Sequence, residues 1–263
     1  MAGSVVAPPL VEPRPHMARE RLVVALDVPA VEEAETIVDR LGEAASFYKI
    51  GLHLQLAPGL HALVAKLHSA GKRIFLDLKY IDIPATVAGA VRSAARLRID
   101  FMTVMGQQQI VRAAVDARGD AGFKILAVTA LTAMTEEDVR REYHTSLTLR
   151  EFVTRRAVAA QRAGADGVIS SPNEIGTIRA AVGAAGFLIV TPGIRPEAAA
   201  PDDQKRTATP REAILRGADH LVVGRPIVRA DDPRDAARRI VDEIASALAE
   251  GSGKRGPAAA DRA

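Results

Sequence analysis

A short charged segment, Asp77-Leu-Lys79-Tyr-Ile-Asp82, carries one ammonium group between two carboxylates. Carboxylates close to a lysine favour its protonated form, and a lysine held protonated at a fixed place can act as an acid toward a substrate. The same residues could form a structural ion-pair network instead, and for any one of them alone the two interpretations are equally good. The segment therefore indicates either proton transfer or a structural network.

Eight short apolar runs alternate with amphipathic, alanine-rich segments along the chain. The runs are rich in β-branched residues and almost continuously apolar, as expected for strands that are buried on both faces of a parallel sheet. They are Leu22–Asp27, Ser46–Gly51, Arg73–Lys79, Asp100–Met105, Phe123–Thr129, Asp166–Ser170, Phe187–Thr191 and His220–Gly224. Segments with helical spacing lie between them, at Val31–Leu41, Thr86–Leu97, Leu149–Ala163 and Arg211–Arg216.

Strands that alternate with helices predict right-handed crossovers and a parallel sheet. Eight such units close into an α/β fold of the (β/α)8 TIM-barrel type, which occupies about 250 residues as one domain. An open, doubly wound sheet is the alternative. It is disfavoured because the units are evenly spaced and no Gly-x-Gly-x-x-Gly motif follows the first run.

Charged residues gather at the carboxyl ends of the first three predicted strands, where barrel enzymes build their active sites. Asp27 ends the first strand, and Lys49 lies late in the second. Side chains alternate along the third strand, so Phe75, Asp77 and Lys79 are expected to face the barrel interior. Charges in a barrel mouth are energetically costly unless they form ion pairs or take part in binding or catalysis. Their convergence on one rim favours a catalytic role over a structural network.

Asp82 follows the third predicted strand and precedes Pro84, which suits the first turn of a helix because its missing N–H costs nothing there. Asp82 is therefore expected in the strand-to-helix loop at the same mouth, with Lys79 flanked by two carboxylates.

The loops after the last two predicted strands indicate a phosphate site. The segment Thr191–Pro196 (TPGIRP) follows the seventh strand, and Gly224-Arg225-Pro-Ile follows the eighth. These loops commonly bind phosphate in such barrels, where a glycine lets the backbone approach an anion and an arginine holds it with two hydrogen bonds. The alternative is a pair of glycine–proline turns with a surface arginine. Residues 194–210 form a long polar loop that could cover the phosphate, with Gln204 as a contact, or be plain surface.

The ends of the chain are expected to lie outside the catalytic domain. Residues 1–20 are proline-rich and interrupted, which predicts a flexible leader rather than a secretory signal. Residues 251–263 predict a disordered tail, leaving 21–250 as the barrel. The chain contains no cysteine, which suits the cytoplasm.

Several functional classes are disfavoured by composition and motif. The net charge is +3 without a dense basic stripe, so no nucleic-acid partner is expected, and no apolar run is long enough to span a membrane. The P-loop, His-Glu-x-x-His and Gly-x-Ser-x-Gly motifs do not occur. Asp77 and Asp82 could hold Mg²⁺, but Lys79 between them would compete. We therefore expect no metal and no redox cofactor.

With these residues assembled, the chain resembles the orotidine 5′-phosphate decarboxylase family over roughly Leu22 to Leu248. The segment from Asp77 to Thr86 (DLKYIDIPAT) matches the family pattern Asp-x-Lys-x-x-Asp-Ile-Pro-x-Thr, which is specific. Further matches are ALD at 25–27, KIG at 49–51, VTALT at 128–132, TPGIR at 191–195 and VGRPI at 223–227. One departure is MGQQQ at 105–109, where the family usually has a histidine followed by small residues.

The resemblance implies decarboxylation of orotidine 5′-monophosphate to uridine 5′-monophosphate in pyrimidine biosynthesis, without metal or cofactor. It implies that Lys79 protonates C6 of the pyrimidine and that Asp77 lies against the substrate carboxylate. Asp82 and Thr86 would reach into the site of a partner subunit, which makes the active unit a homodimer. The other implied contacts are Asp27 and Lys49 with the ribose, Thr132 and Pro192 with the pyrimidine, and Gln204, Gly224 and Arg225 with the 5′-phosphate.

Two rival functions remain open at this point. One is a Mg²⁺-dependent enzyme on the same scaffold, such as a keto-acid sugar phosphate decarboxylase or a hexulose phosphate synthase. The other is a phosphate-binding barrel without catalysis. The Ile83-Pro84-x-Thr86 continuation and the loop with Gln204 favour orotidylate over the first, and the intact charged segment disfavours the second.

Overall fold

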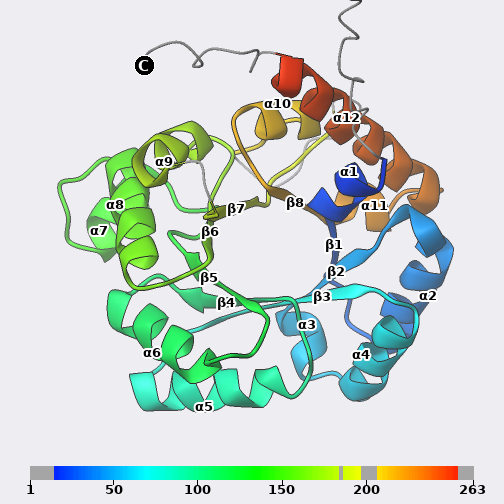
Figure 1. Ribbon diagram of the computed structural model, residues 1–263, viewed down its shortest axis with the longest axis horizontal. Helices are drawn as coiled ribbons and strands as arrows, with labels where there is room; N and C mark the ends of the chain where they lie inside the picture. Colours follow the sequence, from blue (N-terminus) through cyan, green and yellow to red (C-terminus); the bar gives the residue numbers. More distant parts are fainter. Residues whose placement is uncertain (1–14, 184–185, 197–205, 254–263) are drawn as a thin grey trace, which may run out of the picture.

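A closed parallel barrel of eight strands in the order β1 to β8 forms the centre of the molecule (Figure 1). The computed structural model describes residues 15–183, 186–196 and 206–253. The strands are β1 Leu22–Leu26, β2 Phe47–Ile50, β3 Arg73–Tyr80, β4 Phe101–Met105, β5 Lys124–Val128, β6 Gly167–Ile169, β7 Leu188–Thr191 and β8 His220–Val223. Strand β8 pairs with β1 and closes the ring, which confirms the predicted (β/α)8 barrel.

Helices surround the barrel on its outer face (Figure 1). They are α1 Pro15–Arg21, α2 Val31–Leu41, α3 Leu52–Gln55, α4 Leu60–Ser69, α5 Pro84–Ala95, α6 Gln108–Arg118, α7 Glu136–Glu142, α8 Leu149–Arg162, α9 Ile175–Val182, α10 Pro210–Leu215, α11 Arg225–Val228 and α12 Pro233–Gly253, with a 3-10 turn at Gly42–Ala44. In the described ranges no helix has both the length and the apolar character needed to cross a membrane.

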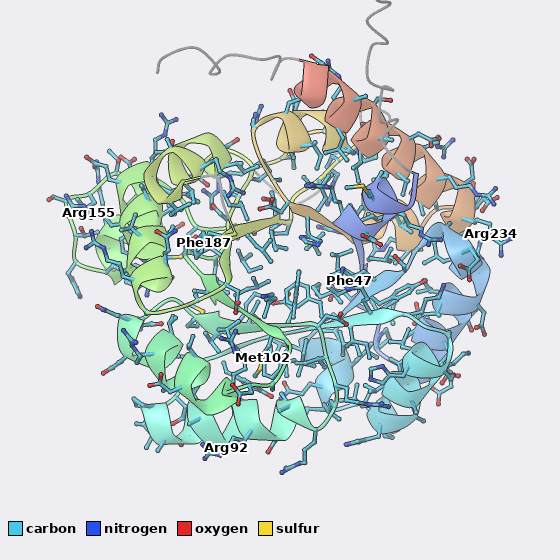
Figure 2. All side chains as sticks on the ribbon, in the orientation of Figure 1. Phe47, Arg92, Met102, Arg155, Phe187 and Arg234 are labelled. Atoms are coloured by element: carbon cyan, nitrogen blue, oxygen red, sulfur yellow. The ribbon has the colours of Figure 1, made fainter. Side chains whose placement is uncertain are left out.

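The strands bury both of their faces in separate apolar clusters. Residues that point inward, such as Phe47, Phe75 and Phe101, fill the barrel interior, whereas Met102 and its outward-facing counterparts pack under the helices. Figure 2 shows Phe47 inside the ring of strands and Met102 between β4 and the helices. The alternation predicted for β3 is confirmed, because Phe75 belongs to the inner cluster and Leu76 to the outer one.

Helices extend into the residues predicted as leader and tail. Residues 15–20 belong to helix α1, where Ala18 is buried and Arg19 Nη1 donates a hydrogen bond to the carbonyl of Glu43 at 2.8 Å. Helix α1 packs against α12, and this tertiary contact orders a segment whose own sequence carries no strong helical pattern. Helix α12 continues to Gly253, past the predicted start of the tail. Residues 1–14 and 254–263 lie outside the described residues.

A cluster of rings closes the amino-terminal end of the barrel. Phe101 meets Phe47 and His220 edge to face, with ring centroids 5.0 Å apart in both pairs. The guanidinium of Arg73 lies over the Phe47 ring at 4.1 Å from its centroid. His220 Nδ1 is enclosed without a hydrogen-bond partner among the described residues. Burial, helped by the charges of Arg73 and Arg21, lowers the pKa of His220 from 6.5 to about 3.

Acid is expected to destabilise the barrel through His220. The folded protein holds this ring neutral, whereas the unfolded chain binds a proton there at about pH 6.5. The stability from this group is therefore complete above pH 6.5 and is lost as the pH falls toward the folded pKa of about 3. The free energy of unfolding, measured by urea titration, should fall by up to about 1.4 kcal/mol per pH unit in that window.

His220→Phe keeps a ring in the cluster and removes the titration, so it should flatten this pH dependence. His61 lies exposed on α4, and His61→Gln serves as the control that should leave the slope as in the wild type. Equal slopes for the wild type and His220→Phe would contradict the assignment.

Candidate active site

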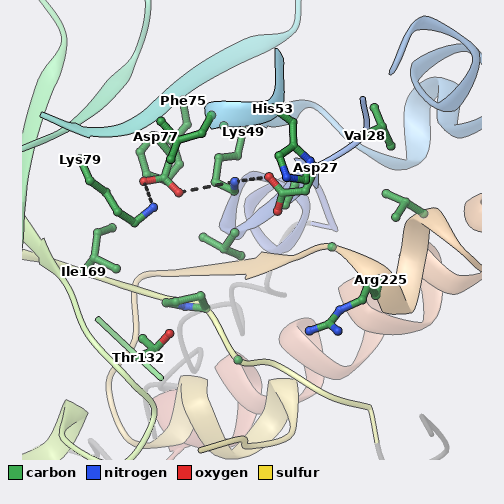
Figure 3. A pocket seen from close by; sticks show the side chains of 18 of the residues that line it. Asp27, Val28, Lys49, His53, Phe75, Asp77, Lys79, Thr132, Ile169 and Arg225 are labelled. Atoms are coloured by element: carbon green, nitrogen blue, oxygen red, sulfur yellow. Dashed lines mark hydrogen bonds and ion pairs between the residues drawn. The ribbon is translucent and has the colours of Figure 1, made fainter. Parts of the chain in front are cut away.

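A pocket of about 740 Å³ opens at the carboxyl ends of the strands (Figure 3). Its floor consists of apolar side chains of the barrel interior, including Phe75, Val128 and Ile169. The predicted residues that line it are Asp27, Lys49, Asp77, Lys79, Thr132, Pro192, Gly224 and Arg225. The barrel therefore brings the charged ends of the first three strands together with the loops after β5, β7 and β8.

Four charged side chains form a line along one side of the pocket (Figure 3). Lys49 Nζ lies 2.7 Å from Asp27 Oδ1 and 3.4 Å from Asp77 Oδ2. Lys79 Nζ lies 2.8 Å from Asp77 Oδ1. Each oxygen of Asp77 thus faces a different ammonium group, and the carboxylate is held between two cations.

The Asp77 carboxyl is ionised despite being buried, with a residue exposure of 9%. Burial alone raises the pKa of a carboxyl group, because it disfavours the charge. The ammonium groups of Lys49 and Lys79, with hydrogen bonds from Lys79 and Thr103, outweigh that effect and lower the pKa of Asp77 below its usual value. A negative charge therefore stands in the pocket next to Lys79.

The side chains of Lys49 and Lys79 differ in their exposure and in their ion-pair partners. The side chain of Lys49 is 8% exposed and tied between two carboxylates, whereas that of Lys79 is 32% exposed and paired with one. A proton donor must reach the atom that receives the proton. Lys79 is therefore the better placed of the two to act on a substrate in the pocket.

Strand β3 is irregular at the point where it presents the charged pair. Leu76 pairs with Met102 of β4, but the next pairing joins Tyr80 to Val104, so β3 carries extra residues opposite Thr103. Lys79 adopts a left-handed backbone, with φ of 51°, which a lysine rarely does and which costs energy. Such strain is held only where the surroundings fix it, as they do around a functional group.

Gly51 lies directly beside the line of charges. A Cβ atom at this position would lie 2.8 Å from Asp27 Oδ1 and 3.0 Å from Lys49 Nζ. A larger residue would therefore require the side chains of Asp27 and Lys49 to shift.

Asp82 does not stand beside Lys79 within one chain, contrary to the expectation of two flanking carboxylates. Asp82 is exposed in the loop after β3, and its carboxylate accepts a hydrogen bond from the backbone N–H of Ile83 at 2.6 Å. Thr86, in the first turn of α5, is exposed as well, and neither residue lines the pocket of its own chain. Strand β3 ends at Tyr80 and α5 begins at Pro84, so Asp82 belongs to the short connection between them and Thr86 to the helix.

The loops after β7 and β8 form the side of the pocket opposite Lys79. Arg225 begins the short helix α11 and points toward the pocket, and Figure 3 shows it across the pocket from Lys79. The loop after β7 is closed at its base by a bridge between Ile194 and Ala208. Gln204 lies outside the described residues, so its contact with phosphate stays a prediction.

Sequence reasoning missed Arg206 and Glu174, which support the loop after β5. Arg206 donates hydrogen bonds to the carbonyls of Thr132 at 3.1 Å and Leu131 at 3.4 Å, and it pairs with Glu174 at 3.1 Å. Glu174 is buried. These residues are far apart in the sequence and match no spacing rule, so the pattern of residue types carried no signal for them.

The segment after β4 departs from the family pattern without disturbing the barrel. Met105 packs in the inner cluster, and the backbone N–H of Gly106 donates to the carbonyl of Val128 at 3.0 Å. A Cβ atom at Gly106 would lie 2.5 Å from that oxygen, so glycine is needed there. Gln107 then precedes the first turn of α6.

Among the described residues, no group of three or more His, Cys, Asp or Glu side chains is arranged to hold a metal ion. The position between Asp27 and Asp77, where a cation would be attracted, is taken by Lys49 Nζ.

Residues 20–240 match the model of the orotidine 5′-phosphate decarboxylase / HUMPS family. The chain belongs to this family. It is 51% identical over 228 residues to the orotidine 5′-phosphate decarboxylase of Cereibacter sphaeroides, which covers 87% of this chain and 98% of the relative. The orotidine 5′-phosphate decarboxylase of Caulobacter vibrioides is 49% identical over 231 residues, with 87% and 98% covered.

Solved structures of the same family share the fold. The crystal structure of orotidine 5′-phosphate decarboxylase from Lactobacillus acidophilus superposes with a TM-score of 0.74 at 37% identity, covering 85% of this chain and 98% of that one. The enzyme from Pyrococcus horikoshii gives a TM-score of 0.67 at 29% identity. The resemblance noted from the charged segment is thereby confirmed over most of the chain.

Proposed function

We propose that this protein is a carbon–carbon lyase that decarboxylates orotidine 5′-phosphate to uridine 5′-phosphate in pyrimidine biosynthesis. The observation that carries the proposal is the Lys79–Asp77–Lys49 group, which presents a reachable ammonium next to an ionised carboxylate at the pocket wall. Membership in the family supports it, as do the two relatives that are 51% and 49% identical in sequence over most of the chain.

The chemistry requires stabilisation of a carbanion. Breaking the bond between C6 and the carboxylate releases CO2 and leaves the electron pair on C6. Lys79 Nζ provides positive charge where this negative charge develops, and then transfers a proton to C6. The lysine regains a proton from solvent, so the balance is orotidylate plus one proton giving uridylate plus CO2.

Groups around the ribose, the pyrimidine and the phosphate supply the binding. Asp27 and Lys49 would contact the ribose hydroxyls, and Thr132 and Pro192 the pyrimidine. Gly224, Arg225 and Gln204 would hold the 5′-phosphate, where a guanidinium forms strong charge-assisted hydrogen bonds. Binding energy gained at the phosphate can be used to orient C6 against Lys79. The position of Arg225 across the pocket from Lys79 supports this division.

The active unit is proposed to be a homodimer with shared sites. Asp82 lies exposed in the loop after β3 between Ile81 and Ile83, which are 60% and 66% exposed, and Thr86 lies exposed in the first turn of α5. Large apolar side chains exposed around a carboxylate suit burial against a second copy of the chain. Asp82 would then complete the site of its partner. We place the protein in the cytoplasm, which a chain without cysteine suits.

Loss of orotidylate absorbance in the ultraviolet tests the function. Purified protein should convert orotidine 5′-phosphate, and prior treatment with EDTA should leave the rate unchanged. A rate abolished by EDTA and restored by Mg²⁺ would instead favour the metal-dependent sugar phosphate enzymes of this scaffold. Absence of turnover with tight binding of uridine 5′-phosphate would favour a non-catalytic phosphate-binding barrel.

A further inference from the structure

Thr103 of β4 contacts both members of the charged pair. Its hydroxyl oxygen accepts a hydrogen bond from the backbone N–H of Lys79 at 2.9 Å and donates one to Asp77 Oδ1 at 3.0 Å. Thr103 is completely buried, and Asp77 Oδ1 is the same oxygen that receives Lys79 Nζ.

The position of Thr103 follows from the irregular pairing of β3 with β4. Between the pairings of Leu76 with Met102 and of Tyr80 with Val104, Thr103 alone stands opposite three residues of β3. Regular ladder bonds cannot serve all of these backbone groups, and a buried N–H without a partner is costly. The Thr103 hydroxyl supplies the missing acceptor for the Lys79 N–H.

This hydroxyl has one proton and two lone pairs. The hydroxyl donates its proton to Asp77 and at the same time accepts the Lys79 N–H through a lone pair. Each of these hydrogen bonds strengthens the other. The result fixes which Asp77 oxygen faces which lysine: Oδ1 receives Lys79 and Thr103, and Oδ2 receives Lys49.

We propose that Thr103 is a positioning residue, which holds Lys79 in its left-handed backbone and turns the Asp77 carboxylate so that Lys79 Nζ points at the reacting carbon. The inference rests on the proposed decarboxylase function for its kinetic consequence. Its structural consequence, a fixed Lys79–Asp77 pair in the free protein, does not depend on that function.

A series at position 103 tests this proposal. Thr103→Val keeps the shape and removes the hydroxyl, and it should lower kcat about 10- to 100-fold, as expected for loss of hydrogen bonds to charged groups. Thr103→Ser keeps the hydroxyl and should stay within about threefold of wild type, with Thr103→Cys, a weak donor and acceptor, between them. The Ser and Cys variants keep the series informative if the Val variant does not fold.

Thr129→Val is the matched control. Thr129 is also a buried threonine and directly follows β5, but its hydroxyl donates to the carbonyl of Ile169 at 3.0 Å and forms no hydrogen bond with Lys79 or Asp77. This variant should leave kcat within about threefold of wild type.

Two further measurements separate positioning from a general structural role. Affinity for uridine 5′-phosphate should be retained in Thr103→Val. The acid limb of its kcat/KM profile should move to higher pH, because Asp77 loses the Thr103 hydrogen bond and the close Lys79 contact, both of which lower its pKa, and keeps Lys49 beside it. Wild-type kcat in Thr103→Val, or a loss of uridylate affinity that matches the loss of rate, would overturn the proposal.

The positioning role of Thr103 can be tested even if the proposed decarboxylase function is wrong. If wild-type protein does not convert orotidylate, crystal structures of the wild type and Thr103→Val still decide the inference. The expected result is that Lys79 leaves its left-handed backbone and the 2.8 Å contact of its Nζ with Asp77 is lost. An unchanged backbone and contact would refute it.

Discussion

Lys79→Ala is expected to lower kcat by about 10⁴-fold while the barrel stays folded. The variant loses both the positive charge beside the developing carbanion and the proton that C6 receives. Lys49 cannot substitute for it, because its ammonium is buried between Asp27 and Asp77. Single-turnover conversion of orotidylate at saturating enzyme measures the chemical step directly.

A surface lysine gives a matched control for this substitution. Lys66 on α4 has a side-chain exposure of 33%, close to the 32% of Lys79, and is paired with Asp39 at 2.8 Å. Lys66→Ala should retain wild-type kcat, and circular dichroism should show both variants folded. A Lys79→Ala enzyme that keeps even about a tenth of wild-type turnover would remove Lys79 from the role of proton donor.

Mixed dimers of two inactive variants are expected to regain about a quarter of wild-type activity. Neither Lys79→Ala nor Asp82→Ala homodimers should work, since every site lacks one group. In a mixed dimer, the Asp82→Ala chain keeps its own Lys79 and receives an intact Asp82 from its partner, which gives one complete site. Random reassortment of equal amounts makes about half of the dimers mixed, each with one working site of two.

The experiment is to unfold the two variants together, refold them, and assay orotidylate conversion. Each variant refolded alone provides the background, and native mass spectrometry of chains with different tags measures the share of mixed dimers. No regained activity in the presence of mixed dimers would mean that Asp82 does not act across the interface.

The barrel could be predicted from the sequence because its signals are local. Continuous apolar runs gave strands such as Arg73–Lys79, which the structure extends to Tyr80, and helical spacing gave α2 at its observed bounds, Val31–Leu41. The convergence of Asp27, Lys49 and Asp77 followed from the rule that parallel strands end at one rim.

The finer geometry of the site could not be predicted, because it depends on contacts between distant segments. The left-handed backbone of Lys79 is against the preference of a lysine and is held by Thr103, 24 residues further along the chain. Asp82 lies outside the pocket of its own chain, in the connection between β3 and α5, and the support of Thr132 by Arg206 joins loops that are 74 residues apart. No local spacing encodes these pairings.

The ring cluster of Phe47, Phe101 and His220 closes the barrel at its amino-terminal end. For the described part of the chain, substrate and products therefore reach and leave Lys79 through the mouth at the carboxyl ends of the strands. In the proposed reaction, carbon dioxide released beside Asp77 shares that exit with the nucleotide it came from. We therefore expect the gas and the product to leave the protein by the same path.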